Sequence, residues 1–63
     1  MSNVILLHKL NNDSFYLNCH LIEKIEENPD TVITLVDGKT LRVCETAAEV
    51  VEFIKAYRIE INR

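Results

Sequence analysis

The sequence predicts a small α+β domain: an antiparallel β-meander of about four to five short strands, followed by one C-terminal amphipathic helix. Three observations lead to this fold class. Turn signals recur at short intervals, the segments between them are β-prone, and the last segment has helical periodicity. The chain has 63 residues, so we expect a single domain over residues 1–63.

The first two strands are expected at about 3–10 and 14–18. Asn11-Asn12 lies between them, and Asn tolerates the left-handed backbone that a two-residue hairpin loop requires. A two-residue loop determines which side chains share a face of the hairpin. One face would carry Val4, Leu6, His8, Leu10, Phe15 and Leu17, and the other Ile5, Leu7, Lys9, Tyr16 and Asn18.

The third segment, 21–27, has two interpretations. Its apolar residues fall at helical spacing among good helix formers, which favours a short helix. However, Asn28-Pro29-Asp30 is a strong turn signal, and a β-prone segment at 31–36 follows it. A strand on each side of a tight turn is the simpler arrangement. We therefore expect strands at 21–27 and 31–36, with a helix at 19–27 as the alternative.

The fifth strand is expected at 39–44, after the hairpin signal Asp37-Gly38. A two-residue loop there pairs Val36 with Lys39. On this register Val32, Thr34, Val36, Leu41 and Val43 share one face, and Ile33, Leu35, Thr40, Arg42 and Cys44 share the other.

The last element is expected to be a helix over 46–61. Thr46 is a good N-cap, and Glu49 three residues later completes a capping box. Ile59 points away from the apolar stripe expected to face the core. That stripe comprises Ala47, Val50, Val51, Phe53, Ile54, Tyr57 and Ile61.

The predicted strands carry apolar residues on both faces, whereas one helix covers a single face of a sheet. Ile33 and Leu35 then need a second cover. Because a chain of this length has a small core, we favour self-association as a homo-oligomer. The alternative is a monomer whose sheet curls on itself.

The central block of the sequence resembles the FlbD/SwrD family of small flagellar and swarming-motility proteins, and the resemblance covers essentially the whole chain. The matching segments occur in order and at the family's spacing. They are Phe15-Tyr16-Leu17-Asn18, Leu21-Ile22-Glu23-Lys24-Ile25-Glu26-Glu27, Pro29-Asp30-Thr31-Val32-Ile33-Thr34-Leu35, Asp37-Gly38-Lys39, Val43, Glu45, Glu49-Val50 and Tyr57-Arg58. The family typically has Leu-Asn-Gly at the first turn, where this chain has Leu10-Asn11-Asn12.

This resemblance implies a bacterial cytoplasmic protein that supports flagellar function or swarming, with the flagellar base as a peripheral location. It implies no enzyme activity and no cofactor, and it assigns no site residues. An unidentified flagellar motor or assembly protein would be its partner.

Composition and motifs exclude several other classes of function. A net charge of −3 argues against a mainly electrostatic nucleic-acid or membrane binder, and no apolar run is long enough to span a bilayer. No phosphate-binding loop or catalytic triad is recognisable, so we expect no catalytic residues. The possible soft metal ligands lack metal-site spacing, so we expect no metal site. These ligands are His8, Cys19, His20 and Cys44.

The remaining interpretation is a protein-interaction module. Its candidate surface comprises the apolar and interface-prone residues of the second sheet face, together with the outward residue of the helix. These candidates are Tyr16, Ile33, Leu35, Arg42 and Ile59. Unpaired backbone on an edge strand is a further place where another strand could bind. The alternative function is a small RNA-binding regulator that uses Tyr16 and Arg42.

Overall fold

The computed structural model describes residues 3–61, with side chains through residue 56. It contains five strands in two small antiparallel sheets, followed by one helix, and so confirms the predicted fold class. The first sheet pairs β1 (Val4–His8) with β2 (Ser14–Asn18). The second has the order β3 (Ile22–Glu27), β4 (Thr31–Leu35), β5 (Thr40–Val43).

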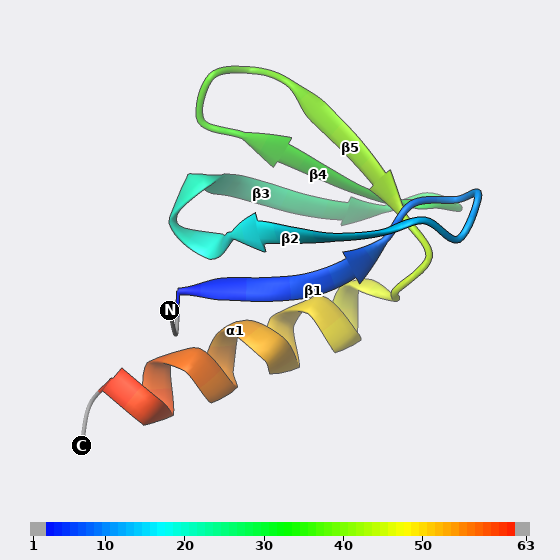
Figure 1. The fold of residues 1–63 in the computed structure, drawn as a ribbon. Helices are drawn as coiled ribbons and strands as arrows, with labels where there is room; N and C mark the ends of the chain where they lie inside the picture. The colour runs from blue at the N-terminus through cyan, green and yellow to red at the C-terminus, as the bar shows by residue number, and fades with distance from the viewer. Residues whose placement is uncertain (1–2, 62–63) are drawn as a thin grey trace.

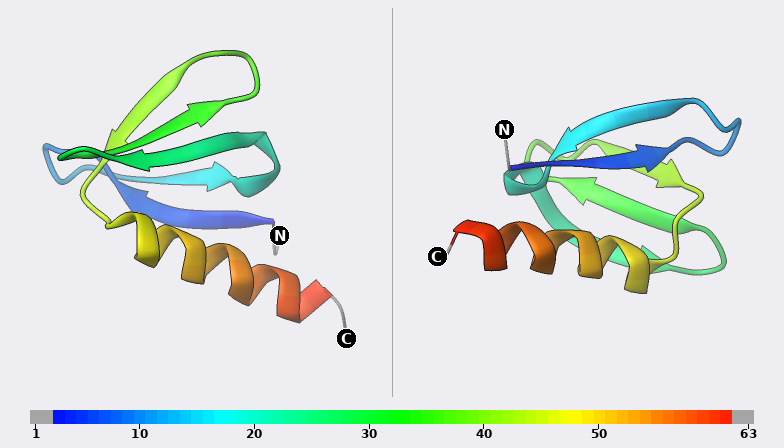
Figure 2. Two further views of the ribbon diagram at one scale, coloured as in Figure 1. Left: turned by 180° about the vertical axis from the view of Figure 1, so that it is seen from behind. Right: turned by 60° about the horizontal axis from the view of Figure 1, so that its bottom comes forward.

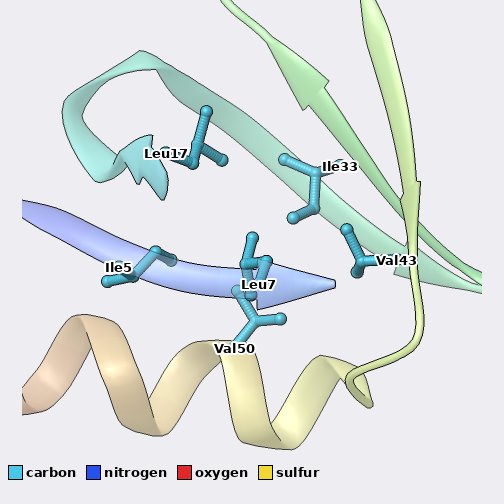
Figure 3. Close-up of a cluster of buried hydrophobic side chains, with 6 residues drawn as sticks. All are labelled: Ile5, Leu7, Leu17, Ile33, Val43 and Val50. Atoms are coloured by element: carbon cyan, nitrogen blue, oxygen red, sulfur yellow. The ribbon is translucent and has the colours of Figure 1, made fainter. Parts of the chain in front are cut away.

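The two sheets and helix α1 (Ala47–Ile61) enclose one core (Figure 1). The helix runs in the direction opposite to β1 and contacts β3 (Figures 1 and 2). Apolar side chains from all three parts meet between them (Figure 3). The buried set is Ile5, Leu7 and Leu17 of the first sheet, Ile33 and Val43 of the second, and Val50 of the helix.

The apolar face around Ile33 is therefore covered within one chain. The first sheet folds over the second, and the two are joined at one end by a bridge between Lys9 and Val43. The Cys44 N–H also donates to the His8 carbonyl at 2.8 Å. The curled arrangement, given above as the alternative, is the one that the structure has. Because Ile33 is buried within one chain, it gives no reason to expect self-association.

Both hairpin registers differ from the prediction by one residue. The first hairpin pairs Leu7 with Phe15 and closes with a three-residue loop, Leu10-Asn11-Asn12, in which Asn12 has a φ of 77°. The expected two-residue loop was wrong because the left-handed residue follows a turn instead of lying within its centre. The shift brings Ile5 and Leu7 to the core and turns Leu6 outward.

The same difference occurs between β4 and β5. Leu35 N–H donates to the Lys39 carbonyl, and Gly38 N–H donates to the Leu35 carbonyl, so the loop is residues 36–38 with Gly38 at a φ of 91°. Ile33 then lies opposite Leu41, and Val32 lies opposite Arg42. The predicted pairing of Val36 with Lys39, and the face assignments that followed from it, were wrong.

The segment before the Asn28-Pro29 turn is a strand, as we favoured, and a single 3-10 turn, η1 (Cys19–Leu21), precedes it. The Asn18 side chain accepts the His20 N–H at 2.9 Å and begins this turn. A bulge between Ile22 and Lys24 shifts the β3 register. Because of this bulge, Ile22 and Ile25 both pack against the core although they are three positions apart.

Helix α1 begins with the predicted capping box. The Thr46 N–H donates to Glu49 Oε1 at 2.8 Å, and the Glu49 N–H donates to Thr46 Oγ1 at 3.1 Å. Glu27 adds a third contact by accepting the Ala47 N–H at 3.0 Å. Among the described side chains of the predicted apolar stripe, Val50 is buried and Ile54 packs on the core, whereas Val51 and Phe53 are exposed. The side chains of Tyr57, Ile59 and Ile61 lie outside the described residues.

Candidate interaction surface

The residues predicted to form an interaction surface do not lie together. Ile33 has an exposed fraction of 0% and lies between the sheets, and Leu35 is half-buried against the core. Both corrections have one cause: the first sheet folds over the face that carries these residues, so the same chain supplies the second cover. The side chain of Ile59 is outside the described part of the chain. Tyr16 and Arg42 are the two described candidates that are exposed.

Arg42 lies on the outer face of the second sheet and is already paired. Its Nη1 atom is 3.4 Å from Asp30 Oδ2, an exposed ion pair across the end of β4. Tyr16 lies on the outer face of the first sheet. Since the inner faces of the two sheets meet at the core, their outer faces are separate surfaces. The structure therefore does not bring Tyr16 and Arg42 together as a platform for RNA bases.

Tyr16 is the centre of an apolar patch that the sequence indicated only in part. It lies directly opposite Leu6, and the two side chains are 72% and 42% exposed. Half-exposed Val4 lies two residues before Leu6, on the same face of β1. The prediction missed Leu6 because the two-residue loop placed it opposite Leu17. We call Val4, Leu6 and Tyr16 the hairpin patch.

A hydrogen-bonded pair joins β1 to the segment before the helix. Glu45 accepts the His8 backbone N–H with Oε1 at 3.0 Å, and its Oε2 is 2.6 Å from His8 Nδ1. The Glu45 side chain is only 13% exposed, while that of His8 is 40% exposed. Burial would raise the pKa of Glu45, but hydrogen bonds from the His8 ring and backbone and from its own backbone outweigh it. The pKa therefore lies below its ordinary value of 4.5.

The sulfur and imidazole groups have structural partners. Cys44 is exposed, and its Sγ donates to the Lys9 carbonyl at 3.1 Å. Cys19 is half-buried and packs against the core. Among the described residues, no three His, Cys, Asp or Glu side chains are grouped in a way that could hold a metal ion.

The protein is thus a small α+β domain with one core and an exposed hairpin patch. Within residues 3–61, no helix is both long and apolar enough to cross a membrane. The family model FlbD, described as flagellar and swarming motility proteins, matches residues 4–62. The chain therefore belongs to this family and is a motility-related protein. Searches of curated proteins and of solved structures gave no match.

Proposed function

We propose that the protein is a non-enzymatic accessory protein of bacterial flagellar motility. It acts through protein–protein contacts as a small oligomeric adaptor, in the cytoplasm or at the flagellar base. The family match over residues 4–62 is the observation that carries this proposal. The hairpin patch supports a role in binding, because an exposed aromatic beside an exposed leucine is typical of protein interfaces.

RNA binding is not a second proposal, because Tyr16 and Arg42 lie on different outer faces and Arg42 is paired with Asp30. Two further ion pairs also occupy lysines of the described surface: Lys24 with Glu26, and Lys55 with Glu52. These pairs reduce the positive charge available to a phosphate backbone.

A clean deletion of the gene tests the proposed function. We expect reduced swarming or swimming with unchanged growth in liquid culture, and restoration by the wild-type gene. Complementation with Tyr16→Ala should restore motility poorly, because the variant removes the most exposed part of the hairpin patch. Thr40→Ala is the matched control, since Thr40 is exposed on β5 of the other sheet. Normal swimming and swarming in the deletion strain would refute the proposal.

A further inference from the structure

Strand β2 has backbone hydrogen-bonding groups that its pairing with β1 does not use. At the two ends of the β1–β2 ladder, Lys9 N–H donates to the Asp13 carbonyl at 2.8 Å and Cys19 N–H donates to the Asn3 carbonyl at 2.9 Å. Antiparallel ladders alternate bonded and non-bonded pairs. The backbone groups of β2 that face β1 are therefore those of Phe15 and Leu17.

The remaining backbone groups of β2 point away from β1, to the free edge of the first sheet. They belong to Ser14, Tyr16 and Asn18. Within the described residues, no strand pairs with β2 on this side. In Figure 1 strand β3 is drawn beyond this side of β2, but the two strands do not pair. The free edge of β2 offers alternating N–H and C=O groups over the length of the strand.

The other strands at the margins of the fold are protected against pairing, whereas β2 is not. Strand β3 has four charged residues among its six, a bulge, and contacts with helix α1. Strand β5 carries Arg42, and its end is joined to β1. On β1, Glu45 and Cys44 occupy the outward N–H and C=O of His8. Charges, bulges and covering elements are the usual ways of blocking an edge strand, and β2 (Ser14–Asn18) has none of them.

We propose that two copies of this chain pair through β2, antiparallel, about a two-fold axis at Tyr16. This register places Tyr16 opposite Tyr16 of the second copy, and Ser14 opposite Asn18. The backbone N–H and C=O groups of all three residues point to the free edge, so each opposed pair exchanges backbone hydrogen bonds. The β1–β2 sheets of the two copies then join into one four-stranded sheet. On its outer face the two hairpin patches become continuous.

Charge favours this strand as the contact between identical copies. Each chain carries a net charge of −3, so two copies repel, and the repulsion is smallest where the touching segments carry no charge. Tyr16 and Leu6 supply the side-chain contacts, and aromatic cross-strand pairs stabilise sheets. One five-residue strand buries less than the roughly 1,200 Å² of standard interfaces, so we expect a weak, reversible dimer.

This proposal deepens the oligomeric part of the proposed function, but it is tested on the purified protein. The first measurement is amide hydrogen exchange by NMR as the protein concentration is raised. We expect the Ser14 and Tyr16 amides to slow by about tenfold once nine-tenths of the chains are paired. The amides of Phe15 and Leu17, bonded to β1, should stay protected at every concentration and serve as the internal control.

The second measurement is the mass in solution, by sedimentation, of wild type and two variants. Tyr16→Lys places two cations against each other at the two-fold axis and should leave a monomer near 7.3 kDa at concentrations where wild type is dimeric. Thr40→Lys adds the same charge to the other sheet and should dimerise like wild type. Both residues are exposed, so both variants should fold, which circular dichroism would verify.

Two results would overturn the proposal. One is a monomer at every concentration with unchanged exchange at Ser14 and Tyr16. The other is an oligomer that survives Tyr16→Lys and leaves these amides unprotected. A normal dimer from a gene whose deletion does not affect motility would instead refute the proposed function and leave the pairing intact.

Discussion

The hairpins β1–β2 and β4–β5 close with the same loop design but with different residues at its critical position. Each loop has three residues: an exposed apolar residue, an Asn or Asp, and a residue with positive φ. In each loop, the side chain of the middle residue accepts a hydrogen bond from the N–H two residues later. Asn11 accepts from Asp13, and Asp37 accepts from Lys39, both at 3.0 Å. The left-handed residue is Asn12 in one loop and Gly38 in the other.

In both loops the middle Asn or Asp, and not only the glycine, marks the loop. Its side chain accepts the N–H two residues on, as such residues do in turns, and the next residue has positive φ. Asn12 can take that position without glycine because short polar side chains tolerate it. The two hairpins thus have the same loop length, but the positive φ costs more free energy at Asn12 than at Gly38.

The largest expected effect compares one leucine on each hairpin. Leu7 of β1 is fully buried, whereas Leu41 of β5 is half-buried at the margin of the core. We expect Leu7→Ala to lower the free energy of unfolding by about 2–5 kcal/mol, enough to unfold much of so small a domain. Leu41→Ala should cost clearly less. Urea denaturation followed by circular dichroism gives both values.

If Leu7→Ala and Leu41→Ala lowered the free energy of unfolding equally, the first hairpin would not contribute the centre of the core. If Leu7→Ala is unfolded in buffer, the smaller change Leu7→Val, compared with Leu41→Val, keeps the comparison measurable.

The loop residues themselves give the next effect. Gly38→Ala should destabilise the domain by about 1–2 kcal/mol, because the added Cβ meets the backbone penalty of positive φ. Apart from the two residues next to Gly38 in the chain, no atom lies within 4 Å of that Cβ. The loss of stability therefore comes from backbone conformation and not from packing. The reverse change, Asn12→Gly, should stabilise by less than about 1 kcal/mol. Thermal unfolding of the two variants would contradict the shared design if both shifted the midpoint in the same direction.

Much of this fold could be predicted because local signals agree with it. Turn residues, β-propensity and helical periodicity predict five strands and the helix that the structure contains, and the Thr46–Glu49 spacing predicts the capping box. The helical spacing of Ile22 and Ile25 remained ambiguous, since a bulge can bring such residues to one face of a strand. Nothing in the local sequence distinguishes that bulge from a helical turn.

The faces could not be predicted, because β1 is apolar at four successive positions, 4–7, and alternation does not choose between them. A one-residue difference in loop length therefore reversed the assignment of core and surface. Ile33 was predicted on a surface for a different reason: one helix covers a single face of a sheet, and the sequence does not show that the first sheet covers the other face. Tyr16, a candidate interaction residue, is exposed, whereas its cross-strand neighbour Leu6 was not among the candidates.

A further, smaller effect than that of Leu7 concerns a contact that, among the described residues, the first hairpin has and the second lacks. The Glu45 carboxylate accepts hydrogen bonds from His8, while the β4–β5 hairpin has no such link to the helix segment among the described residues. Glu45→Gln should lower the free energy of unfolding at pH 7 by about 1 kcal/mol, because the amide replaces a charged acceptor. Glu52→Gln, on the exposed helix surface, is the matched control.

The pH dependence of stability tests whether the charge of the Glu45 carboxylate, and not only its shape, contributes to the fold. Because the pKa of Glu45 is lower in the folded protein than the ordinary 4.5, its ionised form stabilises the fold. That contribution is fully present above the unfolded value and is lost as pH falls through the folded pKa. Wild-type stability should therefore fall more steeply below about pH 4.5 than that of Glu45→Gln, with Glu52→Gln following wild type. Parallel curves for all three proteins would show that the His8–Glu45 contact adds no charge-dependent stability, and that both hairpins depend on their loops and core alone.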